Sequence, residues 1–118
     1  MSDSTQILAL ARAHFDNMRG QEIEIPEWSD PESDDTLVGF YDPPTLRVRQ
    51  AIQRRAGKSE GRMMALVVIL CLKDKDGKVL FKDDAESLAT LESKVDPKVV
   101  ARVAQSILQT SEDSDLGN

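Results

Sequence analysis

The chain has 118 residues and a formal net charge of −6, and 40% of its residues are hydrophobic while only 4% are aromatic. This length suits one domain with a single core and argues against two large domains. The lone cysteine, Cys71, excludes an internal disulfide, and no basic and apolar leader follows Met1. We therefore expect a cytoplasmic protein.

Charge is unevenly distributed along the chain. Residues 1–42 carry a net charge of −8, residues 43–62 carry +5, and residues 63–118 carry −3. The basic segment has two interpretations. It is either a solvated helix face whose charge balances that of acidic residues 1–42, or a patch that binds a partner.

The first predicted helix begins at Asp3, which forms a capping box with Gln6, and ends at Gly20. Its apolar residues recur at helical spacing and define one apolar face. This face consists of Ile7, Leu8, Ala11, Phe15 and Met18.

Two short strands are predicted next. Residues 22–28 alternate between polar and apolar, although Pro26 restricts this strand to a sheet edge or ends it. An acidic, turn-rich loop leads to the second strand, residues 37–41. We expect the two strands to pair antiparallel and to hide Trp28 and Phe40 against the helices.

A basic helix is predicted over residues 44–57. Asp42 is its expected N-cap, Pro43 lies in its first turn, and Gly57 ends it. One flank of this helix is formed by Val48, Ala51, Ile52 and Arg55.

Residues 63–72 form an uncharged, almost wholly apolar run. A bilayer-spanning helix needs about 20 such residues, so we expect this run to form the core rather than to cross a membrane. Periodicity does not separate helix from strand in so apolar a segment. Its Met63-Met64 start and its length favour a helix, whereas Val67-Val68 at its centre favours a strand, and both remain open.

Two further helices are predicted after this run. Asp83 and Glu86 form a capping box for a helix over residues 84–92, and Asp96-Pro97 opens the last helix. The apolar stripe of the last helix consists of Val99, Val100, Val103, Ile107 and Leu108.

These elements define an α+β fold. We expect a mostly helical, small single domain over residues 1–110, with a short antiparallel two-stranded element. Residues 111–118 are polar and acidic, and we expect them to form a disordered tail.

The segment Asp74-Lys75-Asp76-Gly77 contains some of the residues that are typical of a calcium-binding loop. With Gly77 at the sixth loop position, Leu72 takes the first position and Leu80 the ninth, where oxygen ligands are needed. We therefore interpret the segment as a turn that reverses the chain.

Catalytic residues are not apparent. His14 is the single histidine, and neither it nor Cys71 has a partner at a recognisable catalytic spacing. The chain also lacks a glycine-rich phosphate loop. We expect a protein that is not an enzyme and that has no cofactor or metal site.

The order of the elements, together with several short motifs, resembles the tail assembly chaperones of long, non-contractile-tailed phages (siphophages) and prophages. The resemblance covers about residues 20–108. Its most specific motifs are Pro26-Glu27-Trp28 at a strand end and the succession Leu70-Cys71-Leu72, Asp76-Gly77-Lys78, Leu80-Phe81 and Asp84-Ala85-Glu86.

This resemblance implies a non-enzymatic assembly factor in the cytoplasm of a bacterial host. Such a chaperone coats the phage tape measure protein, keeps it soluble and helps to recruit tail tube subunits during tail morphogenesis. The alternative is a small adaptor or structural module, with the basic helix at residues 44–57 as its candidate surface for nucleic acid. The acidic character of the chain opposes binding to phosphate, so nucleic acid is the less favoured partner.

The uneven charge also predicts weak self-association. Basic residues of one copy would meet acidic residues of the next in a head-to-tail contact, to which each exposed ion pair contributes about 0–1 kcal/mol. The candidate interaction residues are Arg47, Arg54, Arg55 and Lys58 on the basic side and Glu22, Glu24, Glu32 and Asp34 on the acidic side.

Overall fold

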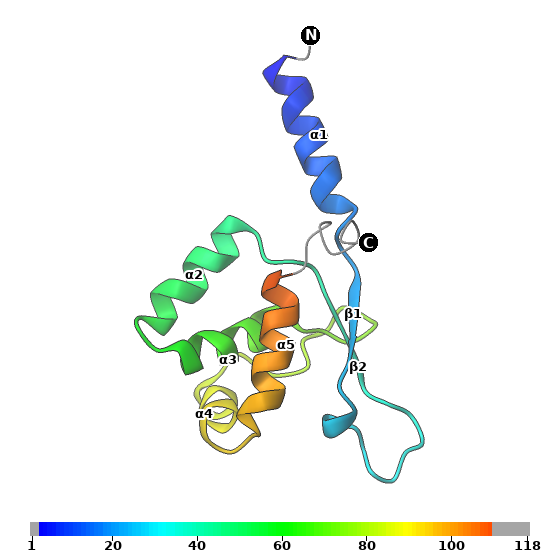
Figure 1. Ribbon diagram of the computed structural model, residues 1–118, viewed down its shortest axis with the longest axis vertical. Helices are drawn as coiled ribbons and strands as arrows, with labels where there is room; N and C mark the ends of the chain where they lie inside the picture. Colours follow the sequence, from blue (N-terminus) through cyan, green and yellow to red (C-terminus); the bar gives the residue numbers. More distant parts are fainter. Residues whose placement is uncertain (1–2, 110–118) are drawn as a thin grey trace.

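A computed structural model describes residues 3–109 of the chain. Its fold is α+β and mostly helical, as the sequence predicts (Figure 1). The predicted acidic tail at 111–118 lies outside the described residues. The elements are α1 (Ser4–Asp16), β1 (Gln21–Glu24), a 3-10 turn η1 (Pro26–Trp28), β2 (Val38–Tyr41), α2 (Leu46–Ala56), α3 (Glu60–Cys71), α4 (Ala85–Ser93) and α5 (Pro97–Gln109).

The apolar run is a helix, α3, and it forms the centre of the fold. It packs against α2, α4 and α5, and six of its residues are buried. The Ser59 side chain caps its start by accepting a hydrogen bond from the backbone N–H of Arg62 at 3.1 Å. A helix that is apolar on every side is stable in water only when other elements surround it, and three helices do so here.

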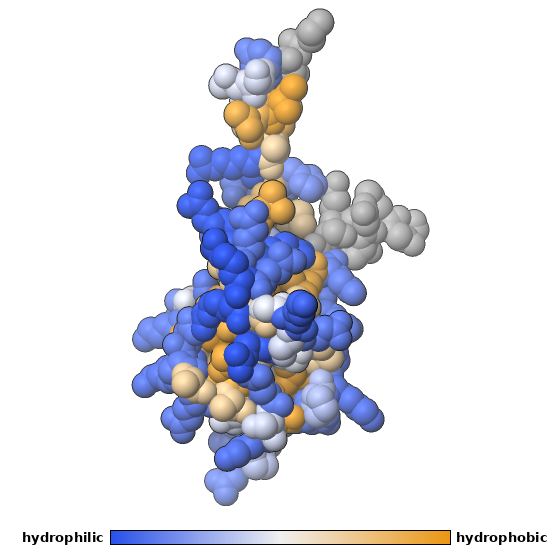
Figure 2. Space-filling model, turned by 90° about the vertical axis from the view of Figure 1, so that its left-hand side faces the viewer, coloured by the Kyte–Doolittle hydropathy of each residue, from blue (hydrophilic) through white to orange (hydrophobic). Residues whose placement is uncertain are grey.

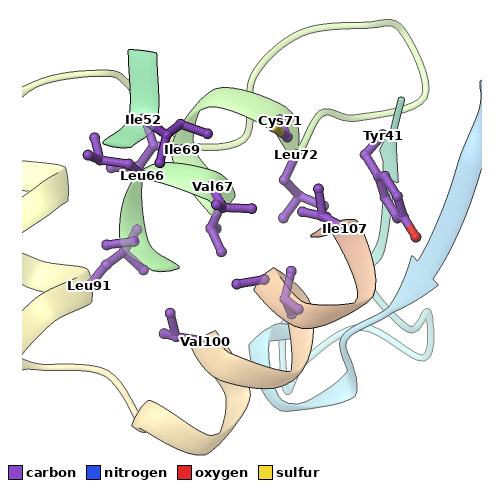
Figure 3. Packing of buried hydrophobic residues seen from close by; sticks show 14 of the residues in the cluster. Tyr41, Ile52, Leu66, Val67, Ile69, Cys71, Leu72, Leu91, Val100 and Ile107 are labelled. Carbon is purple, nitrogen blue, oxygen red and sulfur yellow. The ribbon is translucent and has the colours of Figure 1, made fainter. Parts of the chain in front are cut away.

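The core is continuous from α2 to α5. Figure 3 shows Leu66 and Ile69 of α3 beside Ile52 of α2, while Leu72 lies beside Ile107 of α5. The predicted stripe on α5 is confirmed, because four of its five residues are buried and Leu108 is half-buried.

The two strands pair antiparallel, as predicted, with Ile23 opposite Gly39. The first strand is shorter than the sequence suggested, because it ends at Glu24 and Pro26 begins a 3-10 turn. Proline lacks the N–H that would continue the ladder. The Tyr41 hydroxyl donates a hydrogen bond to the Ser106 carbonyl at 3.1 Å and so ties β2 to α5.

The prediction for the first helix was wrong at its C-terminal end. α1 ends at Asp16 rather than near Gly20, and none of its residues is buried. It stands away from the other helices (Figure 1), with hydrophobic side chains gathered on its surface (Figure 2). The predicted apolar residues do recur along α1, but no other part of the described chain buries the face that they form.

The predicted N-caps of two helices were also wrong. Thr45, not Asp42, caps α2, because Pro44 disfavours a helical conformation at Pro43 and delays the helix start. Asp42 instead accepts a hydrogen bond from the Gly20 N–H at 2.8 Å. Asp84 rather than Asp83 caps α4.

Candidate interaction site

An apolar groove opens where the 3-10 turn meets the segment before α4. Trp28 and Phe81 pack edge to face there, with ring centroids 5.6 Å apart. The groove has a volume of about 280 Å³. It is lined by the hydrophobic residues Trp28, Leu37, Leu80, Phe81, Leu91 and Val95. We call it the Trp28–Phe81 groove.

Trp28 is positioned by the turn that Pro26 starts and by an ion pair next to it. The Arg102 guanidinium on α5 donates to the two carboxylate oxygens of Glu27 at 2.6 and 2.8 Å. These hydrogen bonds lower the pKa of Glu27 to about 2. The pair therefore remains charged over the physiological pH range and holds the turn against α5.

Phe81 is positioned by the chain reversal that precedes it. The Asp74 carboxylate accepts hydrogen bonds from the backbone N–H groups of Asp76 at 2.8 Å and Lys78 at 3.0 Å. Gly77 adopts a φ of +84°, which side chains rarely allow. The predicted turn is thus confirmed, and it directs Leu80 and Phe81 back toward Trp28.

All the groove residues except Leu91 are half-buried. A solvent-facing surface that contains both tryptophan and phenylalanine has the composition of a protein-interaction site, since aromatic residues are enriched at such sites. The sequence analysis missed the groove because it expected Trp28 to be hidden against the helices. One feature of the sequence could have pointed to the groove, namely that aromatic residues make up only 4% of the chain.

The basic candidate residues divide into two groups. Arg55 forms a bidentate ion pair with Asp83, with N–O distances of 2.8 and 3.0 Å. Part of its charge is therefore neutralised within the chain. This contact raises the pKa of Arg55 and lowers that of Asp83. Arg47, Arg54 and Lys58 are exposed, and none of them forms an ion pair within residues 3–109.

The acidic candidates lie away from these arginines. Glu22 and Glu24 are exposed on β1, and Glu32 and Asp34 are exposed in the loop that leads to β2. Figure 1 shows α2 on the left of the molecule and the strands with their loop on the right. The structure therefore does not bring the two sets together within one copy, and the head-to-tail contact stays a prediction.

The position of Cys71 disfavours its thiolate form. It is buried at the end of α3, and this burial raises its pKa to about 11. His14 is exposed on α1, far along the chain from Cys71. Within residues 3–109, no group of three or more histidine, cysteine, aspartate or glutamate residues is arranged to hold a metal ion.

No protein-family model matches this chain, and neither the curated proteins nor the solved structures contain a match to it. Among the helices of the described segment, none has both the length and the apolar character that crossing a membrane requires.

Proposed function

We propose that this protein is a non-enzymatic phage tail assembly chaperone that binds the tape measure protein and helps to recruit tail tube subunits. The observation that carries the proposal is the Trp28–Phe81 groove. Pro26-Glu27-Trp28 and Leu80-Phe81 are two of the motifs on which the resemblance to these chaperones rests, and they meet at one apolar surface.

The groove has the chemistry that such a client requires. A tape measure protein is a long helix with apolar stripes, and an amphipathic helix binds by inserting side chains at spacings of three and four residues into an apolar groove. A hollow of about 280 Å³ accepts only a few side chains. Each contact is therefore weak, and many copies along one client bind it reversibly, as an assembly factor that leaves the finished tail must.

Trp28 also provides the test, because it is the single tryptophan of the chain. A tryptophan-free helical peptide from a tape measure protein should shift its fluorescence emission on binding. Co-expression should also increase the soluble fraction of the full-length tape measure protein.

Variants test whether the groove is responsible. Leu80→Ser should weaken the fluorescence titration at least tenfold, and Leu37→Ser is a second groove variant in case the first does not fold. Leu46→Ser is the matched control, since Leu46 is 79% exposed on α2 and lies outside the groove. A folded groove variant that binds the peptide and solubilises the client as well as the control does would overturn the proposal.

The alternative function is an adaptor that binds nucleic acid through α2. The observation that favours it is the spacing of Arg47 and Arg54, which lie seven residues apart and so share one side of α2. Figure 2, which faces α2, shows a largely hydrophilic surface there. Gel-shift titration with duplex and single-stranded DNA at low salt separates the functions, because only the adaptor should bind, with an affinity that falls steeply as salt rises.

A further inference from the structure

The outer edge of β1 has no strand beside it within residues 3–109. The sheet consists of β1 and β2, and β2 is joined on its other side by an isolated bridge to Lys73. The Phe40 N–H donates to the Lys73 carbonyl, and the Lys73 N–H donates to the Phe40 carbonyl, both at 2.8 Å. The far edge of β2 is therefore occupied, and β1 (Gln21–Glu24) provides the free edge. We call it the β1 edge.

The strand register shows which backbone groups of β1 point outward. The Ile25 N–H donates to the Leu37 carbonyl at 2.8 Å, one step beyond the paired strands. In an antiparallel pair, hydrogen-bonded residues alternate with residues whose N–H and C=O groups point away from the partner strand. Ile23 therefore bonds to β2, while the backbone groups of Glu22 and Glu24 point away from it.

These outward groups are suited to binding another strand. Among the described residues, one contact reaches them, from the Arg102 guanidinium to the Glu24 carbonyl at 3.5 Å. The Glu22 N–H, the Glu22 C=O and the Glu24 N–H remain for a partner. An extended segment of another chain adds to such an edge by exchanging backbone hydrogen bonds with it.

The side chains of Glu22 and Glu24 give the edge a negative charge. Successive strand residues point to opposite faces, so the two carboxylates share one face of the sheet, where both are exposed. Ile23 lies between them, points to the other face and is half-buried. An added strand therefore meets carboxylates at alternate positions and an apolar side chain between them.

Nearby cations leave this negative charge in place. Lys73 shares the face of Glu22, but Phe40 stands between them in the sheet. Two ion pairs flank the strand, and each is neutral as a whole: Arg19–Asp42 before its start and Arg102–Glu27 beyond its end.

We propose that the β1 edge binds an extended basic segment of a partner protein by antiparallel strand addition. Lysine or arginine residues at alternate positions of the partner lie opposite Glu22 and Glu24, and an apolar residue between them lies beside Ile23. Directly opposed residues of opposite charge stabilise a strand pair. The edge contains none of the residues that line the Trp28–Phe81 groove, so this surface is separate from the proposed client site.

The charge of the edge disfavours a second copy of this chain as the occupant. If β1 paired with β1 of another copy, glutamates would face glutamates, because the outward backbone groups belong to Glu22 and Glu24 in both copies. Like charges directly opposite each other destabilise a strand pair, and charged edge strands prevent identical chains from joining. The same two carboxylates attract a basic strand.

A peptide titration tests the proposal. The probe is a capped peptide of alternating lysine and valine, added to the full chain at low salt and followed by NMR. Glu22→Gln combined with Glu24→Gln should weaken binding about tenfold, because both opposed charge pairs are lost. Glu32→Gln combined with Asp34→Asn is the matched control, since it removes the same charge from exposed loop positions outside the edge. An equal loss in the two double variants, or no binding to the native chain at millimolar peptide, overturns the proposal.

Methylation of the peptide backbone separates strand addition from simple charge attraction. Methyl groups on the lysine backbone nitrogens remove the donors that face β1 and should abolish binding. Methyl groups on the valine nitrogens, which face away, should be tolerated. Equal binding of the two methylated peptides overturns the proposal.

Hydrogen exchange locates the contact on the chain. The unmodified peptide should slow exchange of the Glu22 and Glu24 amides, whereas the Ile23 amide is already bonded to β2. Exchange at Glu22 and Glu24 that does not change on binding overturns the proposal. Slow exchange of both amides without peptide, at high protein concentration only, would assign the edge to a second copy and overturn it as well.

Discussion

Trp28 and Phe81 meet edge to face, with their ring centroids 5.6 Å apart, although one follows the first strand and the other precedes the fourth helix. One long-range contact and one local turn bring them together. The Glu27–Arg102 ion pair holds the turn that carries Trp28 against α5, and the reversal at Asp74 returns the chain to present Phe81. The proposed client site is therefore a product of tertiary packing.

Truncation within α3 should strongly destabilise the fold. Leu66 is fully buried at the centre of the core. Leu66→Ala should lower the free energy of unfolding by about 2–5 kcal/mol, because it removes buried methyl groups and leaves a cavity. Differential scanning calorimetry should show a melting temperature lower by roughly 8–20 °C. Leu46→Ala, at an exposed site, should change it little, and a loss of only a degree or two for Leu66→Ala would contradict the central position of α3.

The ion pair between Glu27 and Arg102 should make a pH-dependent contribution to stability. The pKa of Glu27 is about 2 in the folded chain against 4.5 for the free group. A carboxyl group with a lowered folded pKa stabilises the fold above its unfolded pKa, and this contribution is lost as the pH falls from about 4.5 to 2. The effect is small because the pair is exposed to water.

Glu27→Gln isolates this contribution. The variant should melt below the native chain at pH 7, and the difference should disappear by about pH 2. Asp42, Asp83 and Asp84 also have lowered pKa values, but they are present in both proteins and cancel in the comparison. A melting difference that stays constant from pH 7 to pH 2 would show that the Glu27 charge has no role.

Two glycines should respond in opposite directions to replacement by alanine. A Cβ atom at Gly39 would lie 2.5 Å from Cδ1 of Leu72, which is itself fully buried, so Gly39→Ala should cost about 1–3 kcal/mol through overpacking. A Cβ atom at Gly61, in the first turn of α3, meets nothing closer than 4.0 Å. Gly61→Ala should therefore stabilise the chain by about 0.4–1 kcal/mol. Urea denaturation measures both, and equal midpoints for the two variants would contradict the tight packing of β2 on Leu72.

The predicted head-to-tail contact should depend on Arg47 and Arg54 of α2, which form no ion pair within residues 3–109. Arg47→Glu combined with Arg54→Glu should reduce association at low salt, while Arg55 is left in place because Asp83 already pairs with it. High salt should have the same effect on the native chain.

A charge-matched control separates this contact from a general effect of net charge. Lys75→Glu combined with Lys78→Glu changes the charge equally, in the turn before Phe81, and should leave association intact. Sedimentation velocity across a salt series is the measurement. Association that ignores both salt and the arginine reversal would rule out this contact.

Local signals in the sequence were sufficient for several elements. Asp96-Pro97 and the stripe from Val99 to Ile107 predicted α5, and the residues around Gly77 predicted the chain reversal. Alternating polarity predicted the strand pair. These predictions succeeded because capping, turn chemistry and amphipathic periodicity act over a few residues, and all the interacting groups lie within one window of the chain.

Tertiary structure decided what local signals left open. Residues 63–72 are apolar on every side, so only the surrounding helices determine that they form a helix. Asp42 and Asp83 are both suited to capping, but contacts with Gly20 and Arg55 engage them elsewhere. The periodicity of α1 likewise defines an apolar face without stating what covers it. Several side chains can be suited to the same local contact, and partners far away in the sequence decide which of them makes it. These partners come close only when the chain has folded.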